Sequence, residues 1–180
     1  MRQPFLKLLL VALLIPATGC GYTSKSLLPS QVKSIHVAAI KNTIDLSSEV
    51  SDKNNFRVTR PGVEVDLTNA IINRFVFDGN LKVTQLEKAS AVLEAKLTDY
   101  RRDALRYSKG DDVQEYRLSI HLDVIVYESQ GHKVLWHDQN VVGDTTFFLS
   151  GPRAITEDEA LTQVVEDVAR RVVEKTIELW

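Results

Sequence analysis

The chain has 180 residues, 44% of them hydrophobic and 26% charged, which is an ordinary composition for a globular protein. Its 22 basic and 24 acidic residues give a net charge of −2, so it lacks the basic excess of proteins that bind nucleic acid electrostatically. A single cysteine excludes an internal disulfide, and the fold must therefore be stabilised by packing alone.

Residues 1–19 have the layout of a secretory signal peptide: Arg2 and Lys7, an apolar run, then small residues directly before Cys20. The apolar run is too short to cross a bilayer, which takes about 20 residues. The order of small residues, Gly and Cys resembles a bacterial lipobox, in which the thiol carries fatty acyl chains such as palmitate. An ordinary signal peptide cut nearby is the alternative. Either way we expect export, with residues 20–31 as a tether and residues 32–180 as one domain.

Residues 32–40 are predicted to form a strand, and the polar, aperiodic residues 41–60 a long loop. A helix is predicted at residues 61–79, because Pro-Gly opens it, acidic residues occupy its first turn and Asp-Gly closes it. Its apolar residues form two stripes, so we expect it to touch two neighbours, either a sheet and a helix or a ligand or partner surface. The main stripe is Val63, Leu67, Ala70, Ile71 and Phe77, and the narrower one is Val65, Ile72 and Val76.

Further strands are predicted at residues 81–86, 91–100, 115–127 and 134–148, with a turn around Gly131. The third of them alternates strictly, which is typical of a half-buried antiparallel strand. Its apolar face is Tyr116, Leu118, Ile120, Leu122, Val124 and Val126, and its polar face is Glu115, Arg117, Ser119, His121 and Asp123.

The last predicted helix covers residues 156–180, where Thr156 and Glu159 form a capping-box pattern ahead of one continuous apolar stripe. The order of elements is β-α-β-β-β-β-α. It predicts an α+β fold with a small, mostly antiparallel sheet and two helices packed on one face. The other face of the sheet is expected to be polar.

No catalytic motif is present in the sequence, so we expect no enzyme, no cofactor and no metal site. His132 and His137 lie five residues apart, and in one strand they would point to opposite faces.

A basic cluster stands out at residues 99–112, which we expect to include the connection between two strands. Arginine and lysine side chains there are suited to binding phosphate groups. The alternative is a solvated hairpin whose charges prevent edge-to-edge aggregation. The cluster consists of Arg101, Arg102, Arg106 and Lys109, with Tyr100 and Tyr107 between them, and Arg153 is a weaker candidate of the same type.

Several stretches together resemble the lipopolysaccharide-assembly lipoproteins, the LptE family. They are "GCGY", "PGVEVDLTNAIINRFVFDG", "AVLEAKLTDY", and "EYRLSIHLDVIVYE" followed by "VLW", and the resemblance covers residues 20–180. The resemblance implies an outer-membrane lipoprotein with two helices on a small sheet. Such proteins plug a large β-barrel, LptD, assist its assembly and bind lipopolysaccharide. A basic residue just before the "EY" strand is implicated in that binding, and Lys109 is the nearest match.

Two features depart from this family pattern: Ala17 stands where a lipobox more often has Leu, and the loop after Asn42 is longer than expected. The alternative function is that of an outer-membrane lipoprotein that activates a periplasmic enzyme, such as a peptidoglycan synthase.

Overall fold

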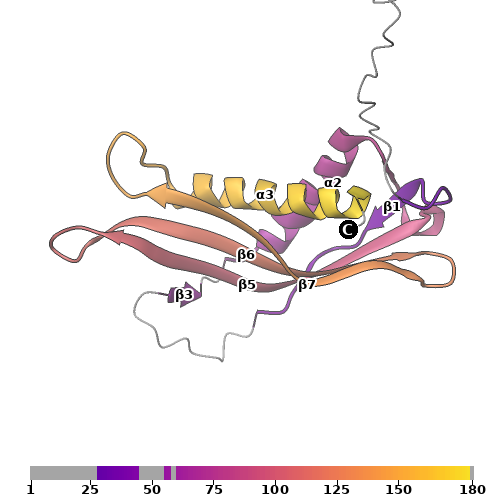
Figure 1. Ribbon diagram of the computed structural model, residues 1–180, viewed down its shortest axis with the longest axis horizontal. Helices are drawn as coiled ribbons and strands as arrows, with labels where there is room; N and C mark the ends of the chain where they lie inside the picture. The colour runs from indigo at the N-terminus through magenta and orange to yellow at the C-terminus, as the bar shows by residue number, and fades with distance from the viewer. Residues whose placement is uncertain (1–27, 45–54, 58–59, 179–180) are drawn as a thin grey trace, which may run out of the picture.

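A computed structural model describes residues 28–44, 55–57 and 60–178 of the chain. These residues form one mixed sheet in the order β4-β1-β5-β6-β7, with β2 and β3 also paired to β5, and two helices on one of its faces (Figure 1). The elements are β1 (Ser34–Val37), β2 (Lys41–Asn42), β3 (Asn55–Arg57), α2 (Val63–Asp78), β4 (Lys82–Val83), the 3₁₀ helix η1 (Leu86–Lys88), β5 (Ala91–Tyr107), β6 (Val113–Glu128), β7 (Val134–Phe148) and α3 (Glu157–Glu178). The predicted α+β fold is confirmed. The predicted signal peptide, Cys20 and most of the tether lie outside the described residues.

Strand β6 is the centre of the sheet, because it pairs with β5 on one side and with β7 on the other along nearly its whole length. Its predicted alternation is confirmed. The five side chains Leu118, Ile120, Leu122, Val124 and Val126 are fully buried under the helices. The opposite face of β6 carries polar side chains. The sheet therefore has one face in the core and one polar face, as the period of two predicts.

Helix α3 covers the β6–β7 side of the sheet with a stripe of small and β-branched residues. The predicted capping box starts it. The Glu159 amide donates to the Thr156 hydroxyl at 3.1 Å, and the Thr156 amide donates to the Glu159 carboxylate at 2.8 Å. A run of valines lowers intrinsic helix propensity, so burial against the sheet must stabilise this helix. Its buried residues are Ala160, Leu161, Val164, Val165, Val168, Ala169, Val172, Val173, Thr176 and Ile177.

The buried side of α2 differs from the prediction. Its core residues are Val63, Leu67, Ile71 and Phe75, spaced four apart, whereas Phe77 is 81% exposed. Of the narrower predicted stripe, Ile72 packs against the core, whereas Val65 and Val76 are exposed. Helix α2 instead meets its second neighbour, α3, along the side that carries Ala70. The apolar residues of this helix cover a wide arc, so the sequence pattern allows either Phe75 or Phe77 to face the sheet. Packing of α2 against β1 and β4 buries Phe75.

Three predicted boundaries are wrong. The predicted loop at residues 41–60 contains β2 and β3, which extend the edge of the sheet along β5. The predicted strand at residues 81–86 has only two paired residues and is followed by η1. Strand β5 continues to Tyr107 rather than ending at Tyr100, because β6 supplies backbone partners for the charged segment that follows. Backbone pairing is indifferent to side-chain polarity, so hydrophobic alternation could not find this extension.

The close packing of α3 on β7 depends on Gly143. A Cβ atom at this position would lie 2.7 Å from the Val168 amide nitrogen and closer still to the Val168 side chain. Both contacts are far inside normal van der Waals separation, and the backbone of a helix cannot move aside alone. We expect Gly143→Ala to lower the free energy of unfolding by roughly 3 kcal/mol, measured by urea denaturation.

The matched control for this substitution is Gly110→Ala, because the nearest atom to a Cβ there is the Ser108 hydroxyl at 3.7 Å. An equal loss of stability in both variants would contradict the role of Gly143 in helix packing.

Candidate functional site

Two connections meet at one end of the sheet, which we call the distal end: the β5–β6 turn at residues 108–112 and the β7–α3 connection at residues 149–156. The turn is closed by the Ser108 amide, which donates to the Asp112 carbonyl at 2.8 Å. A bridge between Phe148 and Ala154 holds the second connection beside β7. The distal end lies on the left in Figure 1, and the 16 residues of β6 span about 50 Å from there to the other end of the sheet.

Arg106 of the predicted cluster and Arg153, the weaker candidate, share one aromatic ring at the distal end. The Arg106 and Arg153 guanidinium carbons lie 5.7 Å and 4.9 Å from the centre of the Phe148 ring. Arg106 also forms an ion pair with Glu115 at 3.5 Å. Glu115, Phe148 and Arg106 are register partners on the face away from the helices, since Tyr116 and the buried Phe147 occupy the other face. Two guanidinium groups therefore stack on a single ring, and Glu115 forms an ion pair with one of them, Arg106.

The other two arginines of the cluster have structural partners. Arg102 lies on the helix side of β5, where it bonds Glu157 at 2.7 Å and stacks over Tyr116 at 4.9 Å. Arg101 is paired with Asp99. The prediction that these residues belong to the connection between strands is wrong, because Arg101, Arg102 and Arg106 all lie within β5. Only Lys109 is in the turn.

The cations left for an external anion are Lys109, Arg153 and, in part, Arg106. Within the described residues neither Lys109 nor Arg153 forms a salt bridge, and both are exposed. The same two segments of chain also expose apolar side chains, with Leu105 and Tyr107 each 41% exposed and Leu149 51% exposed. A surface that offers cations and hydrocarbon together fits a ligand that carries phosphate groups and acyl chains.

Three residues of the distal end were not predicted from the sequence: Phe148, Leu149 and Glu115. The stretch "TTFFLSGPR" held a signal for the first two, because aromatic and apolar residues run there directly into a Gly-Pro turn beside Arg153. Glu115 was placed on the polar face of its strand, but its pairing with Arg106 depends on the bulge between Ala104 and Arg106. A bulge changes the register by one residue, and the sequence carries no marker for it.

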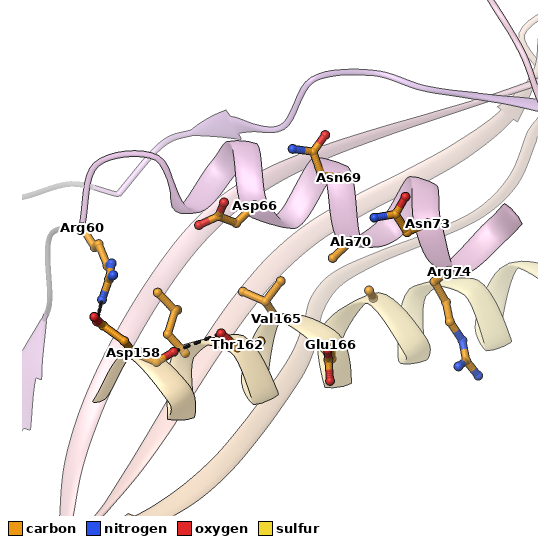
Figure 2. Close-up of a pocket in the computed structure, with 12 residues that line it drawn as sticks. Arg60, Asp66, Asn69, Ala70, Asn73, Arg74, Asp158, Thr162, Val165 and Glu166 are labelled. Atoms are coloured by element: carbon orange, nitrogen blue, oxygen red, sulfur yellow. Dashed lines mark hydrogen bonds and ion pairs between the residues drawn. The ribbon is translucent and has the colours of Figure 1, made fainter. Parts of the chain in front are cut away.

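A groove of about 620 Å³ between α2 and α3 is the second candidate (Figure 2). Its ends are closed by the ion pairs Arg60–Asp158 and Arg74–Glu174. Carboxylates and one hydroxyl line it, and the Thr162 hydroxyl donates to the Asp158 backbone carbonyl at 3.1 Å rather than to a side-chain base. Its apolar lining consists of Ala70, Leu161, Val165 and Ala169.

Over the described ranges, 28–44, 55–57 and 60–178, no three His, Cys, Asp or Glu residues come together as metal ligands. The two histidines predicted to point to opposite faces of one strand do not share a strand, because His132 lies in the turn before β7 and His137 lies within β7. Each has a separate partner. His137 bonds Asp123 at 2.7 Å, and His132 stacks on Tyr127 at 5.5 Å. Within the same ranges no helix has the length and hydrophobicity needed to span a bilayer.

Tyr100 lies beneath the start of α3, 1% exposed, and its hydroxyl has no hydrogen-bond partner in the described part of the chain. Burial, together with the nearby Glu157 carboxylate, raises the pKa of this phenol to about 12 from its ordinary 10.0. Folding therefore favours the neutral phenol. The contribution of the neutral Tyr100 phenol to the free energy of unfolding is fully present below pH 10 and is lost as the pH rises toward 12.

We expect Tyr100→Phe to remove this alkaline dependence. At neutral pH the substitution loses no hydrogen bond and should leave the free energy of unfolding unchanged or raise it by about 1 kcal/mol. Urea denaturation at a series of pH values from neutral to strongly alkaline tests this, with the exposed Tyr107→Phe as control. Parallel curves for the wild type and Tyr100→Phe above pH 10 would show that the Tyr100 phenol ionises as easily in the folded chain as in the unfolded one.

The sequence profile of one protein family, LptE (Lipopolysaccharide-assembly), matches residues 32–176, which is most of the chain. The chain belongs to the LptE family. The family is defined by lipopolysaccharide assembly and not by a reaction, so the assignment supports an assembly protein. No curated protein sequence is similar enough to this chain to count as a relative.

Several solved structures are similar to this chain at low sequence identity. A lipoprotein B of Nitrosomonas europaea is 14% identical, with 83% of this chain and 88% of that chain covered and a TM-score of 0.49. A hypothetical protein of Chlamydia trachomatis is 13% identical, with coverages of 80% and 95% and a TM-score of 0.49. The rare lipoprotein B of Shewanella oneidensis is 13% identical, with coverages of 78% and 89% and a TM-score of 0.43.

Proposed function

We propose that this LptE-family chain is an outer-membrane lipoprotein, anchored through acylated Cys20, that plugs and helps assemble the β-barrel LptD and binds lipopolysaccharide. The observation that carries the proposal is the distal end, where exposed cations and apolar side chains lie together. Lipopolysaccharide presents phosphates and acyl chains side by side, and this surface offers a partner for each. Lys109, Arg153 and Arg106 would contact the phosphates, and Leu105, Tyr107 and Leu149 the hydrocarbon.

The length of the sheet supports the role of a plug. The described chain begins at Leu28, just before β1, at the end opposite to the distal end. The sheet extends about 50 Å between these ends, whereas a bilayer with its headgroups is about 40–45 Å thick. A domain tethered to the periplasmic leaflet by its N-terminus is long enough to bring Lys109 and Arg153 to the opposite leaflet, provided that a water-filled channel surrounds it.

The open face of the sheet supports the same proposal, because barrel lumens are polar. Side chains on this face bond one another across strands: Tyr127 donates to Glu94 at 2.7 Å, and His121 and Asn140 are 2.8 Å apart. Such a face can lie against a hydrated lumen without leaving buried polar groups unpaired.

Purification from membranes tests the anchor and the partner. A tagged full-length chain should co-purify with a large β-barrel, and the mass spectrum of its mature N-terminus should show an acylated Cys20. A tagged chain with Cys20→Ser, which cannot be acylated, is the control and should leave the membrane fraction. Recovery of a peptidoglycan synthase without a barrel would favour the alternative function of enzyme activation.

Charge reversal at the distal end tests ligand binding. We expect Lys109→Glu together with Arg153→Glu to weaken lipopolysaccharide binding about tenfold or more, because each charge-assisted hydrogen bond contributes about 1.5–3 kcal/mol. Binding is measured by isothermal titration calorimetry. Both residues are exposed, so the free energy of unfolding should change by no more than about 0.5 kcal/mol.

The matched control is Lys82→Glu with Lys88→Glu, which makes the same change in net charge on exposed lysines at the other end of the sheet. An equal loss of affinity in both double variants would mean that net charge, and not the distal end, governs binding.

A further inference from the structure

The C-terminal end of α2 presents apolar side chains to solvent. Phe77 is 81% exposed and Val76 is 65% exposed, while Phe75, two residues earlier, is fully buried. Among the large hydrophobic side chains of the described residues, Phe77 and Val76 are the two most exposed. An exposed aromatic residue beside a β-branched one at the tip of a helix is unfavourable in water and points to a contact surface.

This tip lies where the chain enters the domain. Strand β4, which follows α2 after only three residues, runs parallel to β1, and the Lys82 amide donates to the Lys33 carbonyl at 3.1 Å. Helix α2 contacts both β1 and β4, and Figure 1 shows the end of α2 rising above the sheet. Cys20 precedes Leu28 by eight residues, which span at most about 28 Å when fully extended. The tip of α2 is therefore held close to any membrane that holds Cys20.

We propose that Val76 and Phe77 insert into the headgroup region of the leaflet that anchors the chain, as a second membrane contact. This inference rests on the proposed acylation of Cys20. A single tether leaves the domain free to tumble, and the tether also keeps the tip at a high effective concentration near the lipid. Under these conditions two apolar side chains suffice to select one orientation, although they would not bind a membrane unaided.

The charges around the tip favour an apolar contact with lipid over electrostatic attraction. The last turn of α2 has no basic residue and ends in Asp78. The Arg74 guanidinium carbon lies 5.4 Å from the centre of the Phe77 ring, and Arg74 is also paired at 3.8 Å with Glu174, a carboxylate that it shares with Arg170. Arg74 is thus the one arginine beside the tip among the described residues of α2, and an acidic partner offsets part of its charge. Aromatic rings flanked by polar groups are typical of the membrane interface. The contact should therefore persist at high salt.

Fluorescence quenching in vesicles tests the inference. Phe77→Trp is introduced into the full-length chain, which is purified from membranes and reconstituted into phosphatidylethanolamine–phosphatidylglycerol vesicles with brominated acyl chains. The emission of the wild-type chain, which contains Trp136 and Trp180, is subtracted. We expect the added emission to be shifted to shorter wavelength and mostly quenched by bromine, at low and at high salt alike. The matched control is Val65→Trp, since Val65 is 57% exposed on the same helix but about 18 Å along its axis.

The outcomes separate this inference from the proposed function. An acylated Cys20 with no bromine quenching of the Phe77→Trp signal overturns the second contact and leaves the anchor intact. A shift to shorter wavelength without quenching also overturns the second contact, because a protein partner rather than lipid would then cover the tip. Quenching at Val65→Trp as strong as at Phe77→Trp also overturns it. A mass spectrum without acyl groups on Cys20 removes the anchor and this inference together.

Discussion

Strand β6 hydrogen-bonds to β5 and β7 along nearly its whole length, and the rest of the structure depends on that pairing. The paired strands bury one face of the sheet under α2 and α3 and leave the other face polar. They also extend well beyond the helices at both ends, as Figure 1 shows. A domain of this size would ordinarily be rounder. Its elongation follows from three long antiparallel strands that need only backbone partners, and not a continuous core, to continue.

This distinction explains how much of the fold could be predicted from the sequence. The periods of β6 and α3 arise from burial, and burial leaves a hydrophobic pattern that can be recognised. The second half of β5 has no such pattern, because from Arg101 to Tyr107 its side chains are exposed or only half-buried on both faces. Helix α2 shows a different limit. Phe75 and Phe77 are both apolar, and only the contact with the sheet decides which of them is buried.

The candidate site was only partly predictable for a related reason. The sequence groups Arg101, Arg102, Arg106 and Lys109 within nine residues, but alternation along a strand sends neighbours to opposite faces, and two bulges change the register between them. Arg101 and Arg102 form ion pairs within the fold. Arg101 pairs with Asp99, and Arg102 pairs with Glu157, which is 55 residues away in the sequence. A cluster of charges in sequence thus divides into groups that hold the fold and groups that remain for a ligand.

The two ends of the sheet then differ in chemistry in a way that fits a chain held at one end. Near β1 the last turn of α2 exposes Val76 and Phe77 and contains no basic residue, which suits lipid. At the distal end Lys109 and Arg153, which have no carboxylate partner in the described part of the chain, lie on the same segments as exposed apolar side chains, which suits an anionic amphiphile. The polar face of the sheet runs between them. A freely diffusing protein would gain nothing from having two chemically different ends. In a chain anchored at its N-terminus, the anchor would fix the position of one end, and the rigid strands would then determine where the other end meets a ligand.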